Sequence, residues 1–171
     1  PCLTDAELFV NGAHGIGISG QYQGSLTPGE WHRVAFTVDL SKRELGKYID
    51  GTNVLSGPVG AEPLGTNAVQ YLDATVGITD GRWSLLPRAL LFADNDAETG
   101  EVFVNSIQFH NNVLTPEQVS ALGRASATGI PYLTQGGIAQ WDFNGSLVSS
   151  VGGLSLAAAF VAPAAAPGVT F

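Results

Sequence analysis

The side chains best suited to metal chemistry lie in one short acidic run. Asp94, Asp96 and Glu98 stand at alternate positions in the sequence DNDAETGE. Calcium prefers several carboxylate and carbonyl oxygens that converge in a tight turn, so these three residues are candidate calcium ligands. The run is not an EF-hand loop, because Gly100 stands at loop position 7 and Asn105 at position 12. A solvated acidic loop between two strands is the simpler interpretation, and calcium is the alternative.

The remaining reactive residues do not form a recognised catalytic pattern. His14, His32 and His110 lack metal-ligand spacing, and no G-x-S-x-G nucleophile motif occurs. His32 falls on the apolar face of an expected strand, which indicates a hydrogen-bonded core histidine. No strand carries the two same-facing carboxylates that a glycosidase needs about 5 to 9.5 Å apart. The sequence therefore predicts no catalytic residue.

The run from Gly15 to Gly20 matches the G-x-G-x-x-G pattern of dinucleotide-binding loops, with Asp39 further along. In that motif the last glycine opens a helix whose N-terminus holds the pyrophosphate. The next residues, QYQGSLTPG, do not form a helix, because glycine and proline interrupt them. We expect these glycines to allow close strand packing or a bulge instead.

Composition excludes several classes of partner. The 171 residues carry a formal net charge of −8, from 7 basic and 15 acidic side chains. This balance argues against nucleic acid and anionic membrane surfaces, since no basic stripe is available to neutralise phosphates. No apolar run is long enough for a membrane-spanning helix. The single cysteine, Cys2, excludes an internal disulfide framework, and a free thiol is a simpler expectation than an intermolecular bridge.

Short strands account for most of the periodic pattern. Strands are expected at residues 6–10, 31–39, 47–49, 52–55, 89–93, 102–109 and 138–143. Asp50-Gly51 separates two of these strands and is typical of a type I′ hairpin turn. Many short strands separated by turn signals indicate a sandwich or a barrel.

One helix is expected after the strands. Thr115 is its N-cap, Pro116 fits its first position, and Gln118 completes a capping box. Gly123 ends it. The inward-facing residues are expected to be Val119, Ala121 and Leu122.

Three tryptophans, Trp31, Trp83 and Trp141, lie beside apolar partners in or at the start of strands. This position indicates core packing. Tryptophans exposed on a concave polar sheet would instead stack on sugars and favour carbohydrate binding.

Two segments together resemble a known family. The sequence LTPGEWHRVA at 26–35, followed by KYIDG at 47–51, is similar to the laminin G-like modules of the concanavalin A-like jelly-roll superfamily. The stretches 91–94, 104–107 and 114–119 resemble the closing hairpin and short helix of those modules. The resemblance implies an all-β antiparallel jelly-roll sandwich with one short helix at about 116–122. No glucanase carboxylate motif of the superfamily is matched.

The resemblance also implies a division of the chain. Residues 1–125 form a jelly-roll body that lacks its usual opening strands, and residues 126–137 form a connector. Residues 138–171 carry the opening strands, beginning with the sequence WDFNGSL. Three origins fit this order: a fragment of tandem modules, a permuted chain that completes its own sandwich, or a tail that completes a neighbouring subunit. The last would give assembly by strand complementation.

We therefore expect a non-catalytic interaction or structural module that is secreted or at the cell surface. Its partner is a protein or a glycan at a cell surface, or copies of itself. The alternative is a calcium-dependent carbohydrate-binding module with calcium at Asp94, Asp96 and Glu98. A divergent glycoside hydrolase is the least favoured interpretation, and no ligand-binding residue is assigned.

Overall fold

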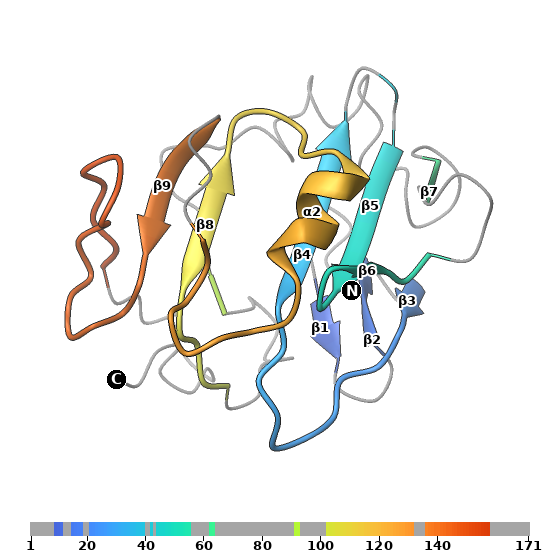
Figure 1. Ribbon diagram of the computed structural model, residues 1–171, viewed down its shortest axis with the longest axis horizontal. Coiled ribbons are helices and arrows are strands. Elements are labelled where there is room, and N and C mark those ends of the chain that lie inside the picture. Colours follow the sequence, from blue (N-terminus) through green and yellow to red (C-terminus); the bar gives the residue numbers. More distant parts are fainter. Residues whose placement is uncertain are drawn as a thin grey trace, which may run out of the picture. The chain divides into compact units, whose positions relative to one another are not determined.

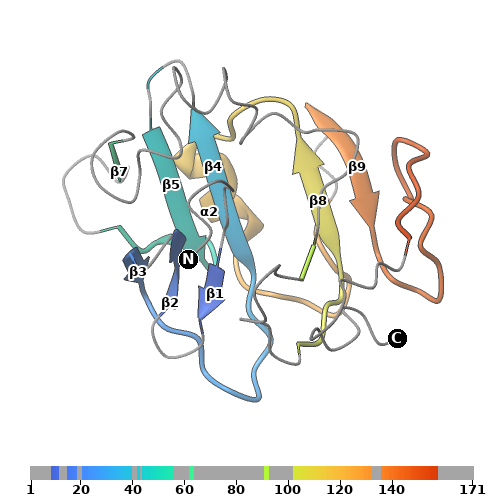
Figure 2. The same ribbon diagram turned by 180° about the vertical axis from the view of Figure 1, so that it is seen from behind.

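The structure is a computed structural model, and the protein is rich in antiparallel β-strands. It describes residues 9–11, 15–18, 21–39, 42, 44–55, 62–63, 91–92, 102–131 and 136–157. The chain divides into two compact units, which we describe separately. One unit contains strands β1 to β7 and helix α2, and the other contains β8 and β9 (Figures 1 and 2).

The central sheet of the first unit is built on the hairpin expected at Asp50-Gly51. Strand β4 (Val34–Asp39) pairs antiparallel with β5 (Glu44–Ile49). Strand β5 pairs on its other side with β6 (Thr52–Asn53) and with β7 (Glu62–Pro63). Asp50 and Gly51 have φ angles of 52° and 77°, as a type I′ turn requires. The predicted hairpin is therefore confirmed.

A second sheet lies against this one. Strands β1 (Phe9–Asn11), β2 (Gly15–Ile18) and β3 (Gln21–Gln23) form an antiparallel meander. The glycine-rich run thus contains a strand and is followed by another, which confirms that it does not open a dinucleotide-binding helix. The fully buried Lys47 of β5 reaches this sheet, where its Nζ donates to Oε1 of Gln23 at 2.7 Å.

Helix α2 (Pro116–Leu122) packs against the hairpin, and in both ribbon views it lies on the opposite side from β1 to β3 (Figures 1 and 2). Thr115 and Gln118 form the expected capping box, and Gly123 is the C-cap. Val119 is buried as expected. The prediction for Ala121 is wrong: it is exposed, because only one side of so short a helix meets the sheet.

The prediction that Trp31 belongs to the core is also wrong. Its side chain is 58 % exposed, because strand β4 begins at Val34 and Trp31 precedes it. Trp141 is 4 % exposed, so the same prediction holds for that residue. Trp83 lies outside the described residues.

The second unit contains a two-stranded sheet. Strand β8 (Ile107–His110) pairs antiparallel with β9 (Gly137–Trp141), with a bulge between Phe109 and His110. The rings of Phe109 and Trp141 meet edge to face, with centroids 6.0 Å apart. After β9 the chain turns back, and Gln140 and Val151 form an antiparallel bridge. Residues on both sides of the 126–137 segment thus build one sheet within the same chain.

In the part of the chain that the structure describes, no helix is long and apolar enough to span a bilayer.

Candidate functional site

The tip of the β5–β6 hairpin brings a carboxylate against three separate segments of the first unit. Oδ1 of Asp50 accepts a hydrogen bond from the backbone N–H of Arg33 at 2.9 Å. Its Oδ2 lies 2.8 Å from Nδ1 of His32 and 3.8 Å from Nε of Arg124. The backbone N–H of Ala125 also donates to this carboxylate. Asp50 therefore links the start of β4, the hairpin and the segment after α2.

These contacts set the ionisation of Asp50. Burial of the carboxyl group favours its neutral form and by itself raises the pKa. The hydrogen bonds from the Arg33 backbone and from His32 stabilise the carboxylate and outweigh burial, so the pKa lies below its ordinary value. Asp50 is therefore ionised near neutral pH and serves as a fixed anionic acceptor.

His32 is fully engaged in this arrangement. Its Nδ1 donates to Asp50, and its Nε2 accepts a hydrogen bond from the backbone N–H of Thr27 at 3.0 Å. A neutral imidazole with its proton on Nδ1 satisfies both contacts. The expected hydrogen bonding of His32 is confirmed, but its expected place on a strand in the core is wrong, because His32 precedes β4 and is only half-buried. Both ring nitrogens are thus engaged within the protein, and the His–Asp pair ties the loop that contains Thr27 to the hairpin tip.

Arg33 connects the sheet to the end of α2. Its guanidinium donates to the carbonyl oxygen of Leu122 and, at 3.4 Å, to that of Gly123. These carbonyls lie at the C-terminus of the helix, where a cation is stabilised by the helix dipole. Arg33 is 8 % exposed. Burial lowers its pKa below the ordinary value, and the Asp50 charge partly offsets that effect. The buried Arg33 guanidinium thus binds the carbonyl groups at the C-terminal end of α2.

The hairpin and the helix end approach so closely that only glycine fits between them. A Cβ atom on Gly51 would lie 2.9 Å from the carbonyl oxygen of Ser120 and 3.1 Å from Cα of Gly123. The turn therefore requires glycine both for its positive φ and for the close contact with α2.

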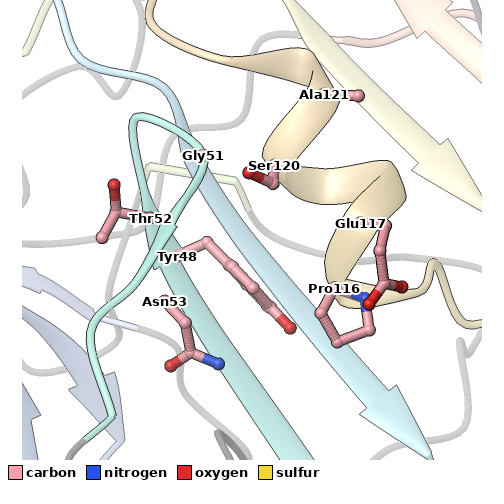
Figure 3. Close-up of a pocket in the computed structure, with 8 residues that line it drawn as sticks. All are labelled: Tyr48, Gly51, Thr52, Asn53, Pro116, Glu117, Ser120 and Ala121. Carbon is pink, nitrogen blue, oxygen red and sulfur yellow. The ribbon is translucent and has the colours of Figure 1, made fainter.

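Beside this contact, the hairpin and the helix form the two sides of an open hollow (Figure 3). Its lining residues are Tyr48, Gly51, Thr52, Asn53, Pro116, Glu117, Ser120 and Ala121. We call this feature the hairpin–helix hollow. The lining residues from the helix are exposed, so the hollow is a shallow groove.

Tyr48 is the aromatic residue of the hollow. Its side chain is 3 % exposed and extends from β5 towards Pro116, with the hydroxyl at the end nearest the helix (Figure 3). Gly46 makes room for the ring, because a Cβ there would lie 2.9 Å from Cε2 of Tyr48. The Tyr48 hydroxyl is not among the buried side-chain atoms that lack a partner in the described residues, which are Nδ1 of His110, Nε1 of Trp141 and Oγ of Ser149.

The rim of the hollow carries further polar groups. Thr52 and Ser120 present hydroxyls, and Asn53 presents an amide whose Oδ1 accepts from the backbone N–H of Leu55 at 2.8 Å. Glu117 presents a carboxylate. Hydrogen bonds from its own backbone N–H and from the Thr115 hydroxyl keep its pKa below the ordinary value. The lining thus combines hydroxyls, an amide and one anion around apolar Pro116 and Ala121.

The predicted calcium ligands Asp94, Asp96 and Glu98 lie outside the described residues, as do Cys2 and His14. Within the described ranges, no group of three or more His, Cys, Asp or Glu side chains could hold a metal ion. The sequence indicated Asp50 only as a turn residue and Tyr48 only as part of a strand. Their roles depend on contacts with residues 114–125, which no local pattern signals.

Comparison of the chain with protein-family models, with curated proteins and with solved structures finds no match.

Proposed function

We propose that this chain is a non-catalytic interaction module of the laminin G-like kind, secreted or at a cell surface. It binds its partner at the hairpin–helix hollow. The observation that carries the proposal is that hollow, a concave surface with polar groups around an apolar wall. The antiparallel strands and the short helix after residue 115 support a jelly-roll sandwich as the scaffold.

Fixed walls support a role in binding. The hairpin side is tied by Asp50, and the helix side is tied by Arg33. A site whose walls are held in place before binding loses less conformational entropy when the ligand arrives. The His32–Asp50 pair supports a non-catalytic role, because both of its ring nitrogens maintain the loop.

Filling the hollow tests this function. Ser120 is exposed on the helix and lines the hollow, so Ser120→Trp places a large ring inside it. Ser25→Trp is the matched control, because Ser25 is exposed and does not line the hollow. We expect the unmodified chain and the Ser25 variant to bind at least one ligand on arrays of extracellular-matrix proteins and glycans. The Ser120 variant should lose that ligand, and equal binding by all three proteins would refute the proposal.

A second candidate is a calcium-dependent carbohydrate-binding module. The 58 % exposure of Trp31 favours it, since an exposed indole is a stacking surface for a sugar ring. If Trp31 is the contact, a bound glycan will shift tryptophan emission, Trp31→Ala will abolish the shift, and a calcium chelator will release the glycan. Persistence of binding in the chelator would exclude this candidate.

A further inference from the structure

The loop that follows β9 presents an asparagine whose amide the fold does not hold in place (Figure 1). Asn144, Gly145 and Ser146 are all exposed there. No hydrogen bond to another described residue restrains the Asn144 side chain. Asn105 is exposed as well, but its Oδ1 accepts from the hydroxyl of Ser106 at 3.1 Å. The Asn144 amide can therefore rotate onto its own backbone more readily than the Asn105 amide can.

The next residue in the chain supplies a nucleophile for that amide. The backbone nitrogen of Gly145 makes no hydrogen bond with a described residue. The φ angle of Gly145 is 78°, and a Cβ at this position would meet nothing within 4 Å, so the turn is open to solvent on that side. Glycine has no side chain that would block the approach to its nitrogen or restrict rotation of its backbone. The Gly145 nitrogen can thus reach Cγ of Asn144 by rotations within the turn.

These two groups are the reactants of an intramolecular ring closure that makes asparagine a thermolabile residue. The Gly145 nitrogen gives its proton to hydroxide or water and attacks Cγ of Asn144. A bond forms between that nitrogen and Cγ, the bond from Cγ to Nδ2 breaks, and Nδ2 takes a proton from water and leaves as ammonia. Water then opens the resulting succinimide ring. Attack at Cγ gives aspartate, and attack at the backbone carbonyl gives isoaspartate, in which the chain runs through Cγ.

We infer that Asn144 is a self-modification site, which the chain converts to aspartate and isoaspartate through a succinimide formed with Gly145. The reaction needs no enzyme, and water is the only co-reactant. Each conversion adds one negative charge to a chain whose formal charge is −8. The inference goes beyond the proposed function and does not depend on it.

Isoaspartate in this turn has a structural consequence, because it adds one atom to the backbone between two anchored positions. Before the turn, a carboxylate oxygen of Asp142 accepts from the hydroxyl of Ser150 at 2.8 Å. After the turn, the backbone N–H of Val148 donates to Oγ of Ser146 at 3.1 Å. A longer turn no longer matches the spacing of these contacts. We therefore expect the modified chain to unfold at a lower temperature than the freshly prepared chain.

Peptide mapping of the full chain after incubation at mildly alkaline pH tests the inference. Trypsin cleaves after Arg124, and Asn144 is the single asparagine of the peptide 125–171. Asn105 lies on the peptide 89–124, and the other Asn-Gly pair, Asn11-Gly12, lies on the peptide 1–33. We expect the mass of 125–171 to increase by one dalton in a growing fraction of molecules, with separate aspartate and isoaspartate peaks. Conversion at Asn105 should be several-fold slower.

A second sample, incubated in guanidinium, shows how fast the unfolded chain reacts. If the peptide 125–171 stays unchanged in the folded chain, the inference is wrong, whether or not the unfolded chain reacts. Conversion at Asn105 as fast as at Asn144 would also overturn it, because the glycine and the unrestrained amide would then have no effect.

Asn144→Gln is the most informative variant, because it keeps an exposed amide but requires a larger ring for the same attack. The mass increase of 125–171 should then disappear, and the aged variant should unfold at the same temperature as the fresh one. Asn105→Gln is the matched control at another exposed asparagine, and it should leave conversion at Asn144 unchanged. A mass increase that persists in Asn144→Gln would place the reaction elsewhere in the peptide. An unchanged unfolding temperature in a chain that contains isoaspartate would refute the structural consequence.

Discussion

Asp50 has two roles: it forms part of the hairpin turn, and its side chain links that turn to segments far away in the sequence. Its carboxylate accepts from His32, from the Arg33 backbone and from the Ala125 backbone. Asparagine at this position keeps the shape, but its amide NH₂ must face one of these donors and leave it unpaired. We expect Asp50→Asn to lower the free energy of unfolding by about 1 to 3 kcal/mol, measured by urea denaturation. Glu30→Gln, which weakens an exposed ion pair with Arg124, should cost less than about 0.5 kcal/mol.

The ionisation of Asp50 gives this contribution a pH dependence of known sign. Its pKa in the folded state lies below that of the unfolded chain. The folded state therefore binds its proton less readily, and the stabilisation is fully present above the ordinary aspartate pKa of about 3.9. It is lost as the pH falls through the folded-state value. The stability gap between the unmodified chain and Asp50→Asn should be constant from neutral pH down to about pH 5 and then narrow. A gap that widens below pH 4 would contradict this assignment.

At the scale of elements, the contact between the hairpin and α2 rests on a glycine. Alanine at Gly51 would be destabilising for two reasons: the φ of 77° strains a residue with a Cβ atom, and that Cβ would clash with the Ser120 carbonyl. Gly29 separates these effects, because its φ is 83° and a Cβ there meets nothing within 4 Å. We expect Gly29→Ala to cost about 1 kcal/mol from backbone strain alone. Gly51→Ala should cost at least about 1 kcal/mol more, since a well-packed contact must also open. Equal costs in thermal unfolding would show that the contact is not tight.

The β5–β6 hairpin and helix α2 were predictable because their signals are local, whereas the strand expected at 102–109 begins only at Ile107 and strands β2, β3 and β7 were not predicted. Asp50-Gly51 fixes a turn, and Thr115 with Gln118 fixes a helix start, whatever surrounds them. The partners of these elements were not predictable. Arg33 falls on the more polar face of an alternating strand, yet it is buried because α2 ends above it. Lys47 is likewise buried against Gln23 of another sheet. Trp31 was misassigned because the alternating sequence pattern begins three residues before strand β4 does.

At the scale of the whole molecule, the acidic excess limits which polymers can approach. A formal charge of −8 over 171 residues disfavours polyanions. The chain should pass through a heparin column at physiological salt without delay, and it should not shift DNA in a gel. Retention on the heparin column that disappears at high salt would contradict this prediction, because it would show a local basic surface despite the negative net charge.

The last question at this scale is whether the segment that begins at residue 138 serves its own chain or a neighbour. Strand β9 pairs with β8 of the same chain, and Trp141 is buried beside Phe109. The chain then returns along β9, where Ser150 N–H donates to the Gln140 carbonyl at 2.7 Å. Pairing within one chain has the advantage of a high effective concentration, so exchange between chains is disfavoured unless strain opposes closure. Light scattering should therefore give a particle of 17.7 kDa that does not grow with protein concentration. A mass that rises in whole multiples of the chain would mean that this segment is donated to a neighbour, as in an assembly formed by strand complementation.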